Sequence, residues 1–360
     1  ISKLKVGFNK VFGYYIEVTK KHQHKIPNEF IRKQTLVNSE RYITEELKSY
    51  EEKVLSAEEK ILEIESKLFY ELCNDVLNEK SMIQENATAI SLLDIYSSFA
   101  LLAIKNNYVK PKITKDRILS IKKGRHPVVE SLLPSTEKFI PNDIIMDANT
   151  NQIHLLTGPN MAGKSTYLRQ LGLMVVMAQI GCFVPAKKAS IGIVDKLFTR
   201  VGASDNLAGG ESTFLVEMNE ASNILNNATD NSFILLDEVG RGTSTFDGLS
   251  LAWAITEHIH NTDGIRARTI FATHYHELTA LEDNLTRLEN HHVEVKEFGD
   301  SIVFMRTIAR GSGDKSYGIQ VAKMAGLPLE VVKRAEQILE YYLGNDMVNR
   351  TQTPCLLYTS

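Results

Sequence analysis

The chain has 360 residues, of which 43% are hydrophobic, and a formal net charge of -3 at pH 7. That length is enough for two or three hydrophobic cores. The net charge is an average over the chain, so it does not exclude nucleic acid as a local partner. We expect no signal peptide and no run of membrane-spanning length. Cys73, Cys182 and Cys355 are too far apart for a disulfide framework or a zinc site, which favours a cytoplasmic location.

Residues 1–42 are basic and rich in β-formers. From Ile1 to Arg41, nine lysines and arginines stand against three glutamates, a balance of +6. Aromatic and β-branched runs at 6–9 and 12–19, separated by turn residues, predict a hairpin or small sheet. A basic β-element can contact DNA phosphates without reading sequence, whereas a solvated lysine-rich surface is the alternative interpretation. The residues assigned to DNA contact are Lys20, Lys21, Arg32 and Lys33.

Residues 43–111 predict long helices. Apolar residues spaced by three and four form one seam, and glutamates occupy the outer face. The seam residues are Leu47, Tyr50, Val54, Ala57, Ile61, Ile64 and Leu68. A second helical stretch over 82–105 ends before Pro111, and we expect it to run back antiparallel to the first. Such a pair is interpreted as a mechanical coupler, although a passive spacer has the same pattern.

A phosphate-binding loop follows within residues 112–312. The apolar run 152–157 predicts a buried strand and 167–177 predicts a helix, so the loop between them lies at a strand-to-helix turn. The loop consists of Gly158, Pro159, Asn160, Met161, Ala162, Gly163, Lys164, Ser165 and Thr166. Its backbone N–H groups and the helix N-terminus favour phosphate, Lys164 is placed to reach the outer phosphates, and Ser165 is a candidate Mg²⁺ ligand.

Two acidic residues end a later strand. The apolar run 232–236 is followed by Asp237 and Glu238 and then by a glycine-rich turn. An aspartate at the end of such a strand typically holds Mg²⁺, and we predict this role for Asp237. Glu238 is the candidate base that accepts a proton from the attacking water. Acidic residues also close strands as solvated ends, so the assignment depends on the preceding phosphate loop.

Two further motifs narrow the class of nucleotide hydrolase. The small-residue turn 208–214 opens an amphipathic helix, with Ser212 or Thr213 as its N-cap, and forms a second anion site. Because the first loop already encloses a triphosphate, the second site is predicted to serve a nucleotide held by another subunit. His274 follows the strand 268–273 and is a candidate hydrogen-bond donor to the γ-phosphate. A lone histidine at a strand end is more often structural.

The order of these motifs resembles that of ABC-type ATPases, and the local sequences resemble the MutS family of DNA mismatch repair proteins. The resemblance rests on residues 157–166, 212–218, 237–245 and 271–275, and it extends from about Leu4 to about Leu343. A transporter signature, Leu-Ser-Gly-Gly-Gln, is replaced here by Gly-Glu-Ser-Thr-Phe. The implied fold is α/β, with an ABC-type P-loop ATPase domain (112–312) preceded by a lever pair of helices (43–111) and the end of a β-rich DNA clamp (1–42).

The resemblance also implies cofactors, partners and contacts. The cofactors are ATP and Mg²⁺, and the partners are duplex DNA with mismatches or small loops, a second copy of the chain in a homodimer, and a repair factor of MutL type. Ser212 of one subunit is expected to face the ATP bound at Lys164 of the other. Phe139, Ile140 and His292 are expected to border the adenine, whereas for Phe139 and Ile140 ordinary core packing is the alternative.

The two ends of the chain carry further expectations. Residues 313–343 resemble a helix-turn-helix that holds the partner subunit, with helices over 316–325 and 329–343. A DNA-reading helix-turn-helix competes, but its second helix has only two basic residues against three acidic ones. Residues 344–360 have no periodicity and are expected to be disordered or non-native. Because the chain begins at Ile1 without methionine, we interpret it as a C-terminal piece that lacks the mismatch-reading domain.

Two rival functions remain open at the level of sequence. The first is an ATP-gated DNA-binding or structural dimer module without turnover, which Glu238 and His274 argue against. The second is a transporter or chromosome-maintenance ATPase of the ABC type. We expect neither a membrane partner nor a very long coiled coil, so an ATP-dependent mismatch repair protein is the favoured interpretation.

Overall fold

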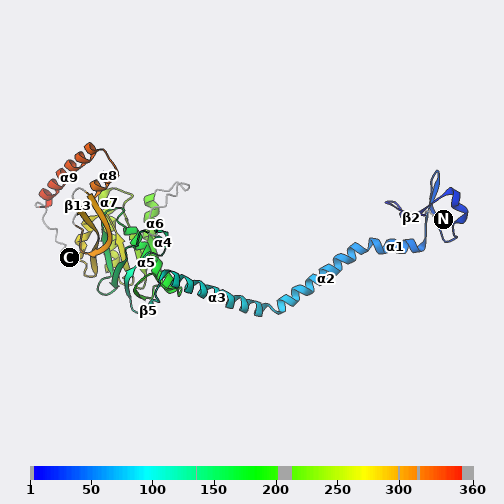
Figure 1. Ribbon diagram of the computed structural model, residues 1–360, viewed down its shortest axis with the longest axis horizontal. Coiled ribbons are helices and arrows are strands. Elements are labelled where there is room, and N and C mark those ends of the chain that lie inside the picture. Colours follow the sequence, from blue (N-terminus) through cyan, green and yellow to red (C-terminus); the bar gives the residue numbers. More distant parts are fainter. Residues whose placement is uncertain (1–3, 135, 202–212, 299–300, 314–316, 351–360) are drawn as a thin grey trace. The chain divides into compact units, whose positions relative to one another are not determined.

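The structure is a computed structural model that describes residues 4–134, 136–201, 213–298, 301–313 and 317–350. The chain divides into two compact units, residues 1–94 and 95–360. Figure 1 labels their helices and strands.

A small antiparallel sheet opens the N-terminal unit. Its strands lie in the order β1, β2, β4, β3, with the bounds Lys5–Asn9 (β1), Gly13–Thr19 (β2), Ile31–Thr35 (β3) and Ser39–Ile43 (β4). The 3-10 helix η1 (Lys20–Lys25) follows β2 directly. Val18 and Tyr42 are buried, and Phe30 packs edge-on against Tyr42. The predicted β-rich segment is therefore a four-stranded sheet with a small core.

Three helices follow this sheet: α1 (Glu45–Leu55), α2 (Ala57–Asn78) and α3 (Lys80–Asn106). Thr44 caps α1, because its Oγ1 accepts a hydrogen bond from the Leu47 amide at 3.0 Å. Ser56 separates α1 from α2, so the predicted long helix is interrupted there.

The expected antiparallel packing of the two long helices does not occur among the described residues. Glu79 alone connects α2 to α3, and a reversal between packed helices needs a loop of about two to five residues. The seam side chains of Ile61, Ile64 and Leu68 stay more than half exposed, at 54%, 58% and 58%.

Helix α3 corrects one expectation from the sequence. By length and composition it is long and apolar enough to cross a membrane, whereas no such run was expected. Almost none of it is buried in the structure. Its sequence also contains Asp94, Thr88 and several serines. One helix of this kind is weak evidence for a membrane span.

A six-stranded sheet is the centre of the C-terminal unit. The described strands follow the order β10 (Leu197–Arg200), β11 (Phe233–Asp237), β12 (Arg268–Ala272), β8 (Ile153–Thr157), β13 (Leu288–Phe298) and β14 (Ser301–Arg310). The first five are parallel, and β14 pairs antiparallel with β13. Every residue of β8, β11 and β12 is buried, which explains why these strands are mostly apolar.

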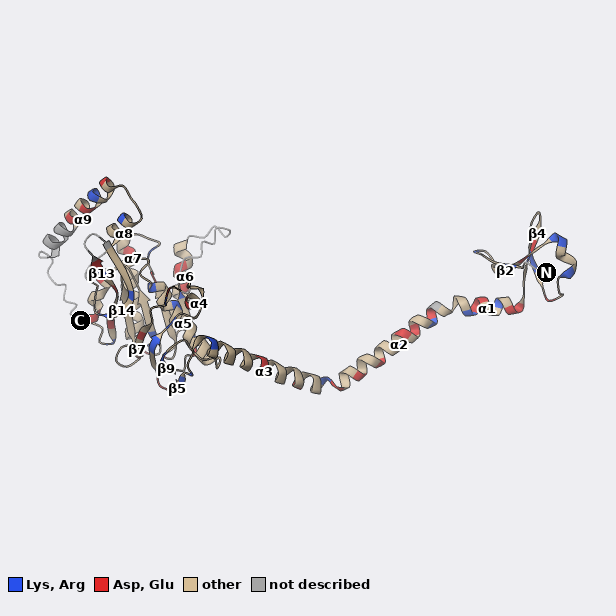
Figure 2. Cartoon of the chain, in the orientation of Figure 1, with Lys and Arg blue, Asp and Glu red and all other residues tan. Residues whose placement is uncertain are grey.

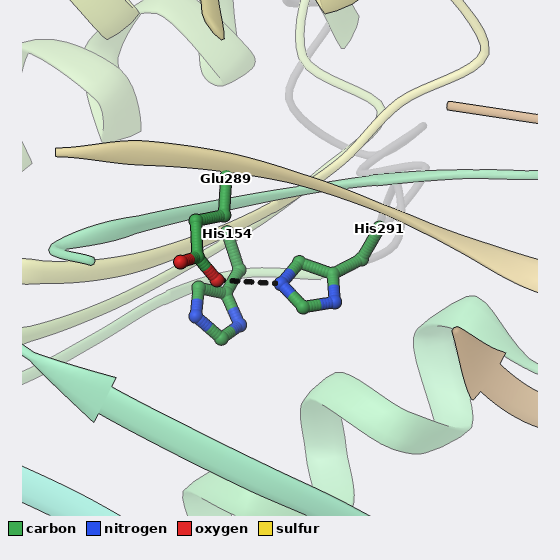
Figure 3. Close-up of side chains that lie close together, drawn as sticks. All are labelled: His154, Glu289 and His291. Atoms are coloured by element: carbon green, nitrogen blue, oxygen red, sulfur yellow. Dashed lines mark ion pairs between the residues drawn. The ribbon is translucent and has the colours of Figure 1, made fainter. Parts of the chain in front are cut away.

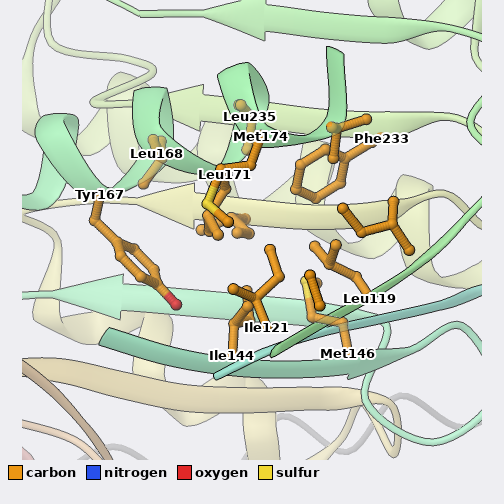
Figure 4. Close-up of a cluster of buried hydrophobic side chains, with 14 of the residues drawn as sticks. Leu119, Ile121, Ile144, Met146, Tyr167, Leu168, Leu171, Met174, Phe233 and Leu235 are labelled. Atoms are coloured by element: carbon orange, nitrogen blue, oxygen red, sulfur yellow. The ribbon is translucent and has the colours of Figure 1, made fainter. Parts of the chain in front are cut away.

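A second sheet and several helices cover the two faces of this sheet. The second sheet has the order β5 (Lys112–Thr114), β9 (Lys188–Gly192), β6 (Ile118–Gly124) and β7 (Asn142–Asp147). It packs with α5 (Lys164–Gln179) on one face, in the core that Figure 4 shows. On the other face lie α6 (Thr213–Asn227), α7 (Thr245–Asn261) and the 3-10 helix η2 (His276–Asp283).

The remaining helices are α4 (Pro127–Leu132), α8 (Gly318–Met324) and α9 (Leu329–Arg350). Helices α8 and α9 correspond to the two predicted helices around Gly326, whose φ of 84° suits glycine. Helix α9 continues to Arg350, seven residues beyond the predicted end at Leu343. Gly344 does not stop it, because a glycine within a helix lowers its stability without breaking it. Residues 351–360 lie outside the described residues.

Candidate nucleotide site

Three neighbouring strands bring the predicted site residues together. Strands β8, β12 and β11 are adjacent and parallel, so their carboxyl ends meet at one edge of the sheet. The phosphate loop follows β8, Asp237 ends β11 with Glu238 next to it, and His274 follows β12. Ligands of open α/β sheets bind at such an edge.

The phosphate loop has backbone conformations that require glycine. Gly158 has φ of 139° and Gly163 has φ of 104°, both in the region that L side chains rarely adopt. A Cβ on Gly158 would also lie 3.3 Å from Cβ of Val293. Gly163 is the N-cap of α5, so the loop leads directly into the positive end of that helix.

Lys164 is the first residue of α5, and only 4% of its side chain is exposed. Its Nζ donates to the carbonyl oxygens of Gly158 at 2.6 Å and Pro159 at 3.3 Å, and it lies 3.9 Å from Oε1 of Glu238. Burial lowers the pKa of Lys164, whereas the nearby carboxylates of Glu238 and Asp237 oppose that shift. The amine thus lies under the loop with an acidic partner across the site.

Asp237 and Ser165 form a small oxygen-rich cluster. Asp237 is buried and accepts a hydrogen bond from the Ser165 side chain. Its Oδ1 has no hydrogen-bond partner among the described residues. Burial raises the pKa of Asp237, because the charged form loses its hydration. A buried carboxylate oxygen beside a hydroxyl is a suitable pair of ligands for Mg²⁺.

Glu238 adopts a left-handed backbone conformation, with φ of 53°. Such a conformation is costly for a residue other than glycine, and residues held in it cluster at functional sites. The Glu238 amide donates to the Ala272 carbonyl at 2.8 Å, which ties the end of β11 to β12. Its Oε2 accepts from Nη1 of Arg241 at 2.6 Å. One carboxylate oxygen therefore faces Arg241 and the other faces Lys164.

The turn after Glu238 is held from two sides at Gly240. Oε1 of Glu217, a buried residue of α6, accepts from the Gly240 amide at 2.7 Å. The hydroxyl of Tyr275 donates to the Gly240 carbonyl at 3.0 Å. The turn thus connects α6 to the segment that carries His274.

His274 and Thr213 lie beside this centre in different cavities. His274 stacks against Tyr275, with ring centroids 4.2 Å apart, and lines a cavity with Asn160 and Arg241. Burial lowers the pKa of His274, so the ring is neutral at pH 7 and keeps one N–H donor. Thr213 lines a second cavity, which Ser165, Asp237 and Glu238 of the same chain also line. Ser212 lies outside the described residues.

The three residues expected near adenine do not share one cavity. Phe139 and Ile140 line a cavity beside the phosphate loop with Met161 and Thr166. His292 lines another cavity, on the side of Gly158 and Pro159, and its Nδ1 lies 2.9 Å from the carbonyl oxygen of Gly311.

Arg306 instead completes the cavity of Phe139 and Ile140. Asn142 of β7 holds the strand of Arg306, β14, in place, because Nδ2 of Asn142 donates to the Arg306 carbonyl at 2.9 Å. Oδ1 of the same side chain accepts from the Ile308 amide at 2.8 Å. These bonds join β7 to β14 across the two sheets.

The four predicted DNA-contact residues are exposed in the N-terminal unit. Lys20 and Lys21 lie in η1, and Arg32 and Lys33 lie in β3. Figure 2 shows basic residues in this unit and acidic residues along the helices. Arg32 is 3.4 Å from Glu40, yet 60% of its side chain remains exposed.

Sequence reasoning missed Arg241, Glu217 and Arg306. Arg241 stands in the glycine-rich turn, where a basic residue three positions after a candidate base was a usable signal. Glu217 is an acidic residue on the apolar face of α6, which was a weaker signal. Arg306 gave no local signal, because its role depends on two sheets that meet across the cavity.

The fold and this edge define an α/β nucleotide-binding domain of the P-loop class. MutS domain V matches residues 154–342, and MutS family domain IV matches residues 1–60. The chain is 58% identical over 340 residues to the DNA mismatch repair protein MutS of Salinibacter ruber, with 94% of this chain covered. It is also 58% identical over 343 residues to that of Thermodesulfovibrio yellowstonii, and 57% identical over 351 residues to that of Clostridium botulinum. The chain belongs to the MutS family of DNA mismatch repair proteins.

The alignments cover 94% of this chain for the first two relatives and 97% for the third. They cover only 37%, 40% and 37% of the relatives themselves. The chain therefore spans about two fifths of the length of these curated relatives.

Proposed function

We propose that this chain binds and hydrolyses ATP with Mg²⁺ and forms the ATPase part of a DNA mismatch repair protein. The observation that carries the proposal is the meeting of the phosphate loop, Asp237 and Glu238 at one edge of the parallel sheet. Family membership supports the same activity.

The residues at this edge fit Mg²⁺ and ATP. The unpartnered Oδ1 of Asp237, as judged from the described residues, and the Ser165 hydroxyl would hold Mg²⁺. The loop amides and Lys164 would hold the phosphates. When bound, Mg²⁺ neutralises charge on the phosphate oxygens and orients them.

Glu238 would accept the proton of the attacking water through one carboxylate oxygen. Arg241 positions that carboxylate through the 2.6 Å bond, and the left-handed backbone of Glu238 directs it into the cavity next to Lys164. His274 would donate its N–H to the γ-phosphate. The adenine would lie against Phe139 and Ile140, in the cavity that Arg306 also lines. His292 would approach the nucleotide from the other side of the phosphate loop, where it lines a separate cavity.

In the whole protein, we assign the exposed basic residues Lys20, Lys21, Arg32 and Lys33 to the backbone of mismatched duplex DNA. The proposed assembly is a homodimer in which Ser212 acts on the nucleotide of the other subunit, with a MutL-type protein downstream. Thr213, which was expected to share this role, lines a cavity with Ser165 and Asp237 of its own chain, so we do not assign it to the other subunit. ATP binding and hydrolysis would control how the dimer clamps on DNA. A cytoplasmic location accords with this role.

One observation favours a second candidate, an ATP-gated dimer module without turnover. Both oxygens of the Glu238 carboxylate face cations, because Oε2 is 2.6 Å from Arg241 and Oε1 is 3.9 Å from Lys164, and a carboxylate held in this way is less free to orient a water molecule. Turnover therefore distinguishes the two functions.

The test is steady-state ATP hydrolysis by the chain with and without Mg²⁺. We expect Mg²⁺-dependent turnover that Lys164→Ala abolishes and that Lys188→Ala, a change of an exposed lysine in β9, leaves unchanged. Tight ATP binding without phosphate release would support the module without turnover. Equal turnover in both variants would contradict the assignment of this site.

A further inference from the structure

The core face of the central sheet carries a cluster of metal-binding side chains that the ATPase proposal does not use. His154 lies in β8, and Glu289 and His291 lie in the neighbouring strand β13 (Figure 3). Glu289 stands opposite His154 in the parallel pairing, and His291 follows two residues later. Because side chains alternate along a strand, all three lie on one face of the sheet.

The donor atoms of this cluster converge. One atom from each residue lies within 4.8 Å of the other two. The two imidazole rings stack with centroids 4.1 Å apart, and Nε2 of His291 is 3.6 Å from Oε2 of Glu289. Zinc–ligand bonds of about 2.0–2.2 Å place neighbouring donor atoms about 3.3 Å apart, so side-chain rotations suffice to close the cluster.

His154 is buried, with 5% of its surface exposed. Its ring is hydrogen-bonded to the backbone of Ile145, whereas Nε2 has no hydrogen-bond partner within the described part of the chain. This pattern is typical of histidine ligands, in which one ring nitrogen bonds a backbone carbonyl and the other binds the metal. Burial lowers the pKa of both histidines, that of His291 to about 4, so both rings are neutral at pH 7.

We propose that His154, Glu289 and His291 form a site for one divalent transition-metal ion, with Zn²⁺ as the best fit. Two imidazoles and one carboxylate are a preferred donor set for Zn²⁺, and hard ions such as Mg²⁺ favour sites made of oxygen alone. The ion joins β8 to β13 four residues before the phosphate loop begins at Gly158, so its role is to fix the strand from which that loop starts.

Arg310 gives the proposal a distinctive test. Its Nη2 lies 3.2 Å from Oε1 of Glu289, so its charge competes with a bound cation. Its side chain is 71% exposed and can turn away into solvent. Removal of this charge by Arg310→Gln is expected to tighten metal binding, whereas a merely structural role of the cluster predicts no such gain.

The experiment uses the full chain, freed of metal by a chelator, in excess Mg²⁺ to saturate the Asp237 cluster. Co²⁺ is titrated as a visible probe and then displaced by Zn²⁺. We expect the chain to bind one equivalent of Co²⁺ and to show the intense visible absorption of a Co²⁺ ion with a low coordination number. We also expect Zn²⁺ to raise the unfolding temperature of the chain. His291→Gln and Glu289→Gln should each weaken binding by about a hundredfold.

The matched controls are His258→Gln, at a histidine on α7 outside the cluster, and Cys73→Ser, at a free thiol in α2. Both should bind Co²⁺ like the unmodified chain. Weak binding at several sites that the cluster variants leave unchanged would overturn the proposal, as would loss of the absorption in either control. Because circular dichroism reports whether each variant is folded, and Arg310→Gln is expected to gain affinity, misfolding cannot imitate the expected result.

Discussion

At the scale of single residues, the proposed site assigns phosphate binding and proton transfer to two different charged side chains. Lys164 lies under the phosphate loop with its amine against two carbonyl oxygens, so it is placed for phosphates. Glu238 extends from a left-handed backbone into the same cavity, with Arg241 holding one of its oxygens. The two side chains are only 3.9 Å apart, yet their chemistry predicts different losses on substitution.

We expect Lys164→Ala to abolish productive ATP binding and Glu238→Ala to preserve binding while slowing hydrolysis about a hundredfold or more. The reason is that, in the proposed mechanism, Lys164 provides charge to the phosphates, whereas Glu238 accepts a proton from water. Filter binding with Mg²⁺ and single-turnover hydrolysis measure the two steps. An equal loss of nucleotide affinity in both variants would refute this division of roles.

At the scale of elements, short polar contacts position the walls of the site. Glu217 on α6 and Tyr275 after β12 both form hydrogen bonds with the backbone of Gly240, so the turn that follows Glu238 is attached to two elements. The cavity of Phe139 is walled in part by α4, which His126 caps. Nδ1 of His126 accepts from the amides of Val128 and Val129, both at 3.2 Å.

The cap on α4 predicts a pH dependence of stability. Burial, reinforced by Arg169, lowers the pKa of His126 below the value of about 6.5 in the unfolded chain. The stabilisation is therefore complete above about pH 6.5 and is lost as the pH falls through the lower pKa of the folded state. We expect a loss of about 0.5–2 kcal/mol in unfolding free energy on acidification.

His126→Asn is the matched variant for this prediction, because asparagine caps a helix without titrating. Urea unfolding at about pH 7 and about pH 5 measures both chains. The asparagine variant should lose less stability between these conditions. An identical loss in the two chains would show that other groups cause the acid sensitivity.

The basic sheet of the N-terminal unit predicts weak, sequence-independent DNA binding. Charge reversal of Lys20, Lys21, Arg32 and Lys33 to glutamate should remove most of the affinity and lower the salt slope by about one per lost phosphate contact. Fluorescence anisotropy with matched and mismatched duplexes at two salt concentrations measures this.

The matched control for DNA binding reverses four exposed lysines on the helices: Lys48, Lys60, Lys67 and Lys80. It changes the net charge equally and should affect binding much less. A clear preference of the chain for mismatched duplex would place discrimination in a segment to which we assign none. Binding that is independent of salt would exclude these residues as the main contact.

At the scale of the whole molecule, the nucleotide site and the basic sheet belong to different units of the chain. In the chain, α1, α2 and α3 lie between the two, and we propose that these helices couple them. The proposed homodimer adds a second requirement, because the sequence predicts an anion site at Ser212 in addition to the phosphate loop, and we assign that site to the nucleotide of the other subunit.

Subunit mixing tests whether Ser212 acts across the dimer. Lys164→Ala and Ser212→Ala chains are each expected to be inactive alone. A mixed dimer contains one composite site in which both residues are intact, so mixing should restore part of the turnover. Phosphate release and native mass spectrometry measure activity and mixing. If the two sites act independently, no recovery in the presence of mixed dimers would contradict the assignment of Ser212 to the other subunit's nucleotide.

The sequence by itself determined the local parts of this protein. The phosphate loop, Asp237 and Glu238 could be assigned because strand, turn and helix signals are adjacent in the chain. The exposed basic residues and both C-terminal helices were likewise predictable. The break at Ser56 was not, because the spacing of the apolar residues hardly changes there. The end of α9 was not predictable either, because the helix continues past Gly344.

Only the tertiary structure decided which distant residues meet. Arg306 joins Phe139 because β14 reaches the small sheet, and His292 lies in a different cavity because it is on another strand. His154 faces Glu289 through the register of β8 with β13, which no local pattern encodes. The free energy of pairing and core packing sets that register, and it depends on the whole sheet rather than on either segment alone.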